Sequence, residues 1–241
     1  MRRILITGSN RGIGLELVRR YLQHDDTLIF ATCRRPAEAN ALNELAQQNP
    51  ERLKLYPLDV TDQDSIDQSR DWISAQTDGL EMLINNAGIL PGGVAAREPS
   101  SASFGALDAN AMLKVFQVNA IAPVMVAQAY ADLLRRGTNA RVINVSSDAG
   151  SITRREAGCD YSYPASKAAL NMMTRCLAGS FRESGVIVIS LHPGWIQTDM
   201  GGPHARMTLE EAVPEIVNVI DKLTLADSGT FLNWDGSRLP W

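Results

Sequence analysis

Two side chains in the second half of the chain have the types and spacing needed to move a proton. Tyr163 and Lys167 are four residues apart, which places a phenol and an ammonium group on the same side of a helix. A free tyrosine has a pKa of ~10 and is a poor acid or base near neutral pH, but a neighbouring positive charge lowers that pKa. Such a pair often arises by chance, so its meaning depends on the residues that accompany it.

A serine hydroxyl accompanies them. Ser147 follows a predicted strand directly, at the edge of the sheet where open α/β folds bind their ligands. Its hydroxyl can donate a hydrogen bond to a carbonyl oxygen and stabilise the negative charge that develops there. With Tyr163 and Lys167 it predicts acid–base chemistry on a carbonyl or an alcohol.

A glycine-rich segment near the N-terminus is typical of a nucleotide-binding turn. The segment reads Gly8-Ser9-Asn10-Arg11-Gly12-Ile13-Gly14. It lies between a predicted strand and a predicted helix, where glycines allow close approach of the backbone and the helix N-terminus offers free N–H groups to a pyrophosphate. A Walker phosphate loop is excluded because no Lys-Ser or Lys-Thr pair follows the glycines.

The end of the second predicted strand indicates which nicotinamide cofactor fits. An NAD-binding unit carries Asp or Glu ~20 residues after the glycine loop, where it holds the ribose 2′-hydroxyl. Residues 31–35 contain no acid and include Arg34, whose guanidinium suits a 2′-phosphate. Arg11 can add a second positive charge. The sequence therefore predicts NADPH rather than NADH, with two solvated surface arginines as the alternative.

The elements that must position these groups are short apolar segments alternating with amphipathic ones. Predicted strands are 3–7, 27–32, 53–58, 81–85, 141–146, 186–191 and, more weakly, 229–233. Predicted helices are 13–22, one that begins at the capping signal 61–64, and 106–136, 165–183 and 209–223, with 91–105 as a surface loop. Near-continuous apolar strands are typical of a parallel sheet covered on both faces. The pattern predicts an α/β fold, a single-domain, doubly wound Rossmann-type sheet with right-handed crossovers, over residues 1–241.

Composition argues against several other classes of protein. The 241 residues carry 23 Lys and Arg against 27 Asp and Glu, a net charge of −4 that gives no general attraction to nucleic acid or anionic lipid. Cys33, Cys159 and Cys176 are widely spaced and suit free thiols in a reducing compartment, and the three histidines form no metal-spaced set. No apolar run approaches the ~18 residues of a membrane span. We expect a cytoplasmic protein with no metal, nucleic-acid or membrane partner.

Five segments, in this order, resemble the motifs of the short-chain dehydrogenase/reductase family. They are 7–14, 85–88, 144–147, 163–167 and 193–194. The resemblance covers the chain from end to end, and the segments 192–202 and 234–241 look most like the C-factor and sniffer type of carbonyl reductase. It implies a sheet of about seven strands in the order 3-2-1-4-5-6-7. It also implies a homodimer or homotetramer formed through the long central helices.

The resemblance also implies roles for individual residues. Tyr163 would protonate the carbonyl oxygen as hydride arrives, and Lys167 would lower the pKa of Tyr163 and hold the ribose hydroxyls. Ser147, rather than Ser146, would orient the carbonyl, and Asn119 would support a water relay to Lys167. The implied cofactor contacts are Gly8, Asn10, Arg11, Gly12, Ile13, Gly14, Arg34, Asp59, Val60, Asn86, Ala87, Gly88, Tyr163, Lys167, Pro193, Gly194, Ile196 and Thr198.

The expected function is NADPH-dependent reduction of a ketone or aldehyde to an alcohol. The interval between Ser147 and Tyr163 is three residues longer than in many family members, and 153–158 is predicted to be a loop at the pocket mouth that affects substrate preference. Apolar residues near the motifs, among them Trp195 and Met200, favour an apolar substrate. The alternative is a cofactor-binding signalling or regulatory protein of the C-factor type, in which catalysis is incidental. A nucleotide-sugar epimerase or dehydratase is a third alternative, for which the chain is short.

Overall fold

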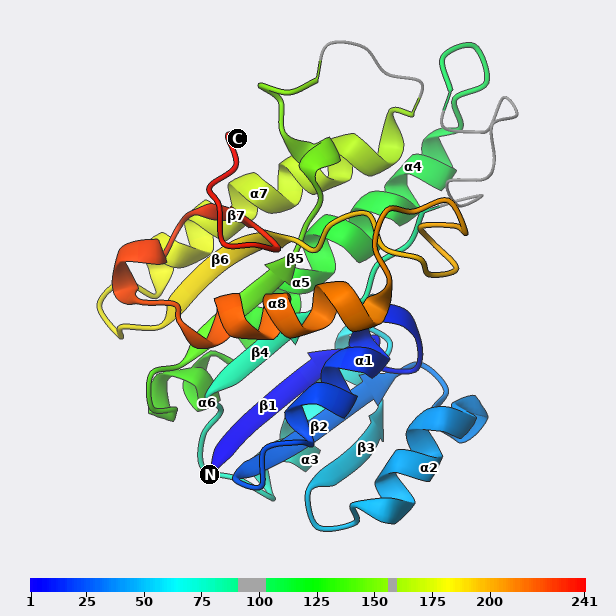
Figure 1. Ribbon diagram of the computed structural model, residues 1–241. Coiled ribbons are helices and arrows are strands. Elements are labelled where there is room, and N and C mark those ends of the chain that lie inside the picture. Colours follow the sequence, from blue (N-terminus) through cyan, green and yellow to red (C-terminus); the bar gives the residue numbers. More distant parts are fainter. Residues whose placement is uncertain (91–102, 156–159) are drawn as a thin grey trace.

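A parallel sheet of seven strands runs through the part of the chain that the computed structural model describes, residues 1–90, 103–155 and 160–241 (Figure 1). The strands are β1 (Arg2–Thr7), β2 (Thr27–Cys33), β3 (Leu53–Pro57), β4 (Met82–Asn85), β5 (Arg141–Val145), β6 (Ile187–His192) and β7 (Phe231–Asn233). Their order is β3-β2-β1-β4-β5-β6-β7, and every neighbouring pair is parallel. The predicted fold class, strand order and strand positions are confirmed.

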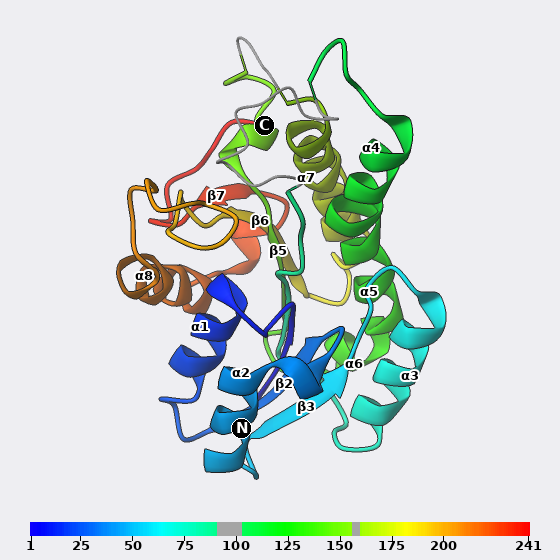
Figure 2. The ribbon, with the colours of Figure 1, turned by 90° about the vertical axis from the view of Figure 1, so that its right-hand side faces the viewer.

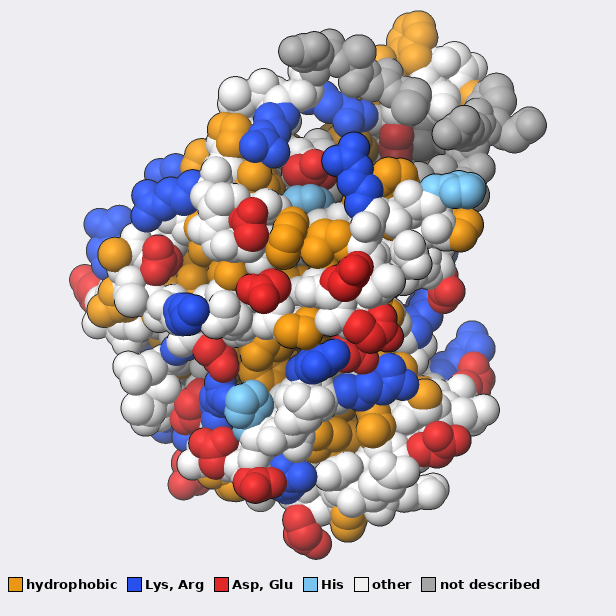
Figure 3. All heavy atoms as spheres, in the orientation of Figure 1, with side chains coloured by type: hydrophobic (Ala, Val, Ile, Leu, Met, Phe, Trp, Pro, Cys, Tyr) orange, Lys and Arg blue, Asp and Glu red, His pale blue; other side chains and the backbone are white. Residues whose placement is uncertain are grey.

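Helices cover both faces of this sheet (Figure 2). On one face lie α1 (Gly12–Tyr21), α2 (Asn40–Gln48) and α8 (Leu209–Asp221), and on the other α3 (Gln63–Ser74), α4 (Ala109–Phe116), α5 (Ala122–Ala129), α6 (Ala131–Arg136) and α7 (Ser162–Ser180). Alternate residues of β1 divide between the two cores: Ile4 and Ile6 pack on the α1 and α8 side, and Leu5 packs on the α3 and α5 side. On the face with α1 and α8, positive and negative side chains are interspersed (Figure 3).

Two predicted helix starts can be compared with the structure, and one helix was not predicted. Asp62 caps α3, since its side chain accepts a hydrogen bond from the backbone N–H of Asp64, as the capping signal predicts. Helix α7 begins at Ser162 rather than at 165, so Tyr163 lies in its first turn. Helix α2 is missing from the predictions because its apolar stripe is short and leaves only Leu42 fully buried.

The predicted helix 106–136 is interrupted twice. A π-helical turn, η2 (Gln117–Ile121), joins α4 to α5, and Tyr130 separates α5 from α6. Pro123 has no N–H group to donate to the carbonyl of Asn119, so the regular hydrogen-bond ladder cannot continue there. The interruption lies at the residue that the sequence marks as functional, because Asn119 is inside the π turn.

The stretch Ala109–Ala129 corrects one expectation about membranes. These 21 residues are long and apolar enough to cross a bilayer by length and composition, and a third of them are buried. The expectation that no segment reaches that length is therefore wrong. The core helix of a soluble protein passes the same test, and here Asn119 of this stretch bonds to Ser166 of α7.

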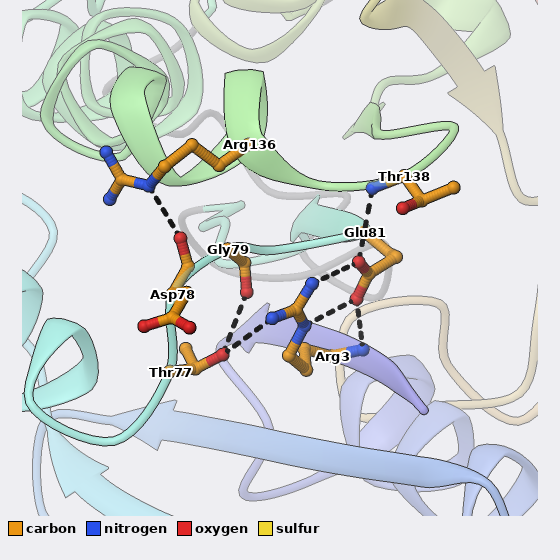
Figure 4. Close-up of polar contacts among 7 residues, drawn as sticks. All are labelled: Arg3, Thr77, Asp78, Gly79, Glu81, Arg136 and Thr138. Atoms are coloured by element: carbon orange, nitrogen blue, oxygen red, sulfur yellow. Dashed lines mark hydrogen bonds and ion pairs between the residues drawn. The ribbon is translucent and has the colours of Figure 1, made fainter.

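Ionic contacts tie the elements together at the end of the sheet opposite the motifs (Figure 4). The guanidinium of Arg3 in β1 binds both carboxylate oxygens of Glu81, at 2.8 and 2.5 Å. Glu81 also accepts a hydrogen bond from the backbone N–H of Thr138, and Arg136 donates to the carbonyl oxygen of Asp78. Burial opposes ionisation of Glu81, but the hydrogen bonds and charge of Arg3 outweigh it and hold the pKa of Glu81 below its usual value.

Some predictions fall on residues outside the described part of the chain. Most of the predicted loop 91–105 and residues 156–158 of the predicted pocket-mouth loop lie there, as does Cys159. Cys33 is buried and Cys176 is exposed, and both are free thiols.

Candidate active site

The glycine-rich turn occupies the carboxyl end of β1 and the start of α1. Gly8 and Gly12 have φ values of +68° and +55°, which favour glycine. A Cβ at Gly8 would lie 2.9 Å from the Cα of Ala87. A Cβ at Gly14 would lie 2.5 Å from Nδ2 of Asn86 and closer still to the carbonyl oxygen of Gly8. Backbones therefore meet here at distances that only glycine permits.

This turn fits the pyrophosphate of a dinucleotide. Within the described residues, no side chain caps α1 and its first turn carries no acid, so the backbone N–H groups at its start keep their positive character for an anion. A Cβ at Gly12 would meet only the side chain of Thr198 within 4 Å, so the loop is not closely packed at this point. Asn10 is exposed beside it, and Ile13 packs inward against the core.

Arg34 and Asp59 lie at the neighbouring ends of β2 and β3, as the cofactor prediction requires. Arg34 is exposed. Asp59 accepts hydrogen bonds from the backbone N–H and the hydroxyl of Thr61, at 2.9 and 2.7 Å. Burial opposes its ionisation, but the Thr61 bonds and the charge of Arg34 keep the pKa of Asp59 below its usual value. Val60, beside it, packs against the core on the α3 side.

Asn86, Ala87 and Gly88 brace the glycine turn from the end of β4. The amide of Asn86 donates to the carbonyl oxygens of Thr7 and Gly8, at 2.9 and 3.0 Å. The backbone N–H groups of Asn86 and Ala87 both donate to the hydroxyl of Thr7. The Asn86 side chain thus supports the loop.

Tyr163 and Lys167 share one side of the first turns of α7. The ammonium Nζ of Lys167 lies 5.7 Å from the centre of the Tyr163 ring and donates to the carbonyl oxygen of Val145 at 2.8 Å. Burial lowers the pKa of Lys167 to about 8. Burial also raises the pKa of Tyr163 to about 12, and the opposing group is the hydroxyl of Ser147. In the absence of cofactor, desolvation therefore outweighs any lowering of the Tyr163 pKa by the charge of Lys167, and the net shift of Tyr163 is upward.

The two neighbouring serines differ in their burial and hydrogen bonds. Ser147 is 9% exposed, accepts a hydrogen bond from the backbone N–H of Ala149, and lies close enough to Tyr163 to lower the pKa of that phenol. Ser146 is 2% exposed, and its hydroxyl donates to Oδ1 of Asn171 at 2.7 Å. The hydroxyl of Ser146 is the more strongly engaged of the two, because that of Ser147 donates only a long bond of 3.4 Å, to Oδ1 of Asp148.

Asn119 is fully buried in the π turn and joins three segments. Its Nδ2 donates to the carbonyl oxygen of Ile89 and to the hydroxyl of Ser166, and its Oδ1 accepts from the N–H of Ile89. The Ser166 hydroxyl in turn donates to the carbonyl oxygen of Tyr163 at 2.7 Å. A Cβ at Gly88 would lie 3.4 Å from Oδ1 of Asn119 and 3.9 Å from Nζ of Lys167. Asn119 and Lys167 therefore face the same small space, where the predicted relay would run.

The segment after β6 lies over the glycine turn. Ile196 pairs with Met207 as an isolated bridge, and Trp195 donates through its indole N–H to the carbonyl oxygen of Gly201, so the segment is braced internally. Thr198 lies above Gly12, as the predicted cofactor contact requires. Pro193 is buried at the start of the segment, and Gly194 has a φ of +90°.

Two titratable residues at this site, Asp199 and His192, were not among the predicted site residues. Asp199 binds Arg11 through a 2.6 Å ion pair between exposed side chains, so the predicted phosphate ligand Arg11 has a protein partner. His192 lies with Nε2 3.6 Å from Oδ1 of Asp148, the residue after Ser147. Burial lowers the pKa of His192, against the opposing charge of Asp148. Spacing along the chain gives no signal for either pair, since the partners are 188 and 44 residues apart.

Comparisons with known proteins agree with this geometry. A family model for short chain dehydrogenases matches residues 2–208. The C-signal of Myxococcus xanthus is 38% identical over 165 residues, which cover 68% of this chain and 95% of the relative. The NADPH-bound carbonyl reductase from chicken fatty liver superimposes with a TM-score of 0.91 at 38% identity, over 100% of this chain and 99% of that one. The carbonyl reductase Sniffer of D. melanogaster gives 0.93 at 36% identity over 100% of both chains. The predicted family and its carbonyl-reductase subgroup are confirmed, and the chain belongs to the short-chain dehydrogenase family.

Proposed function

We propose that the protein is an NADPH-dependent carbonyl reductase that converts a ketone or aldehyde to an alcohol. The observation that carries the proposal is the grouping of three side chains: Lys167 Nζ lies 5.7 Å from the centre of the Tyr163 ring, and the hydroxyl of Ser147 lowers the pKa of the same phenol. The relatives support it: one solved structure is a carbonyl reductase with NADPH bound, and another is the carbonyl reductase Sniffer.

Each residue of the site has a definable task in this reaction. When bound, the nicotinamide cofactor supplies the hydride. Ser147 Oγ donates a hydrogen bond to the substrate oxygen and fixes its position. Tyr163 Oη gives its proton to that oxygen as negative charge develops there. A pKa of about 12 for Tyr163 keeps the phenol protonated through the neutral range, which suits an acid.

Lys167 and Asn119 are the other two residues of the predicted catalytic set. Lys167 is 5% exposed and its ammonium is anchored on Val145, so it contributes a positive charge from a fixed point. Once Tyr163 has given up its proton, that charge stabilises the phenolate. Asn119 holds the segment at Ile89 and, through Ser166, the first turn of α7.

The choice of NADPH rests on Arg34. Its exposed guanidinium lies at the end of β2 and acts on Asp59, which supports a position beside the adenosine of a bound cofactor. A cation there suits the 2′-phosphate of NADPH. Arg11 can bind the same phosphate with the N–H groups that Asp199 leaves free, because the ion pair uses only Nη1.

The test is NADPH consumption over a panel of ketones, aldehydes and quinones, repeated with NADH and with two tyrosine variants. Y163F is expected to lose turnover while still binding NADPH. Y161F is the matched control, since Tyr161 is 45% exposed and precedes α7. Turnover by Y163F equal to that of the unmodified protein would disprove the assigned mechanism, and a preference for NADH would disprove the role of Arg34.

A signalling role is the second candidate, favoured by one finding. The relative that is 38% identical over 68% of this chain is named C-signal. In such a protein NADPH would bind without rapid turnover of any carbonyl. Tight binding in the same assay, with no substrate in the panel consumed, would favour this candidate.

We also propose that the protein forms a homodimer or homotetramer through α4, α5 and α7. Three large apolar side chains on these helices and the π turn are exposed: Leu113 by 67%, Ile121 by 46% and Met172 by 65%. Single exposed apolar residues are common, but several on adjoining helices are typical of an interface. Light scattering of the protein and of an L113E/M172E variant tests the proposal, with a monomeric variant as the expected result.

A further inference from the structure

The side-chain amide of Asn171 forms two hydrogen bonds with the turn that carries Ser147. Asn171 lies one helical turn beyond Lys167 on α7. Its Oδ1 accepts the Ser146 hydroxyl at 2.7 Å, and its Nδ2 donates to the carbonyl oxygen of Gly150 at 3.3 Å. The amide therefore binds the residue before Ser147 and the residue three positions after it.

The turn that carries Ser147 lies directly against the backbone of α7. A Cβ at Gly150 would be 2.7 Å from the carbonyl carbon of Lys167 and 2.9 Å from the backbone nitrogen of Ala168. Gly150 is buried, and its own N–H donates to the carbonyl oxygen of Ser147 at 2.9 Å. The turn is thus pressed onto the helix by close packing and held there by the amide.

Burial raises the free-energy cost of losing either of these two hydrogen bonds. Asn171 is 3% exposed and Ser146 2%, so water cannot replace a lost partner. A buried donor or acceptor left without a partner carries the full cost of desolvation, so the turn would move to satisfy it. Ser147 lies inside this turn and would move with it.

We propose that Asn171 is a positioning residue, which ties the turn bearing Ser147 to the helix bearing Tyr163 and Lys167. It sets the separation of two hydroxyls that must reach one carbonyl oxygen. This inference rests on the proposed function. A displacement of ~1 Å between reacting groups can cost about a hundredfold in rate, so a residue that touches no reacting atom has a large effect here.

The first test compares N171A with S146A and with N218A, a control at an exposed position of α8. For N171A we expect kcat to fall by about ten- to a hundredfold while the Kd for NADPH stays within about twofold. S146A removes one of the two bonds and should give a smaller loss, and N218A none. Unchanged kcat in N171A, or an equal loss of NADPH affinity, would overturn the proposal.

The second test uses pH. N171D keeps the acceptor for Ser146 but turns a carboxylate oxygen toward the carbonyl of Gly150, which it repels. Because burial raises the pKa of the introduced carboxyl, a moderate fall in pH protonates it and restores the donor. The kcat of N171D, divided by that of the unmodified protein, should therefore rise as the pH falls. A ratio that does not change with pH would contradict the role of the Gly150 bond.

The third test does not depend on activity. The backbone N–H groups of Ala149, Gly150 and Ser151 are bonded within the turn, and their hydrogen exchange reports its opening. We expect faster exchange at these three amides in N171A, with no change in β1. If the unmodified protein consumes no carbonyl, the proposed function fails, and this exchange still decides whether Asn171 holds the turn. Equal exchange in N171A and the unmodified protein would overturn the proposal that Asn171 holds the turn on α7.

Discussion

Replacing Gly14 by alanine tests the fold and the cofactor cradle together. The added Cβ would lie 2.5 Å from Nδ2 of Asn86 and closer still to the carbonyl oxygen of Gly8, whereas ordinary contacts begin near ~3.5 Å. The start of α1 and the end of β1 must therefore separate by about 1 Å or more. Overpacking of this kind costs about 1–3 kcal/mol, which for a chain of this length lowers Tm by about 2–12 °C.

The same displacement weakens the binding of NADPH. The N–H groups at the start of α1 can no longer converge on the pyrophosphate, and loss of one hydrogen bond to a charged group costs about 1.5–3 kcal/mol. That is a rise in Kd of about ten- to a hundredfold, measured by fluorescence titration of NADPH.

The matched control is Gly179→Ala, because a Cβ there meets nothing within 4 Å. Gly179 lies near the end of α7, where alanine is preferred over glycine by about 0.5–1 kcal/mol, so Tm should rise slightly. If G14A matched the unmodified protein in both Tm and Kd, the close approach of β1, β4 and α1 would be refuted. A loss of stability without a loss of NADPH affinity would refute the assigned cradle alone.

Three further perturbations have defined outcomes. Burial lowers the pKa of Lys167 from 10.5 to about 8. Between these two pH values the unfolded chain therefore binds more protons than the folded protein. This residue thus makes the free energy of unfolding rise with pH across that window, by about 1.4 kcal/mol per pH unit at most. Urea unfolding of K167M should lack that rise. D199N releases Arg11 from its ion pair and leaves its full charge for the 2′-phosphate, so it should slow the release of NADPH, by about fivefold or less, and leave that of NADH unchanged, in stopped-flow displacement. W241A removes the ring stacked on Phe231 and should lower the free energy of unfolding by about 1–3 kcal/mol, and W241F should restore most of it.

Each of these three predictions has an outcome that would contradict it. An unchanged slope of stability against pH in K167M would mean that Lys167 keeps an ordinary pKa. High salt should abolish the effect of D199N, and an effect that persists in high salt would exclude a simple ion pair. Equal losses in W241A and W241F would show that the stacked ring is not what the position contributes.

The sequence by itself determines the sheet and the motifs. Strands such as β1 and β6 are continuous apolar runs, and their type and order follow from local composition and from the resemblance to a family. The glycine turn and the pair Tyr163 and Lys167 are also readable, because each is a short segment whose geometry follows from neighbours within a few residues. Arg34 is found by its distance from the glycine turn.

Interactions between distant segments are decided only by the tertiary structure. Sequence reasoning expects Lys167 to lower the pKa of Tyr163, but burial, which depends on the whole fold, raises it instead. The pairing of Arg11 with Asp199 joins residues 188 positions apart. The family resemblance favours Ser147 over Ser146, but it gives no physical reason for that choice. The hydroxyl of Ser146 donates to Asn171 on another element, and only the packing of that turn on α7 brings the two residues together.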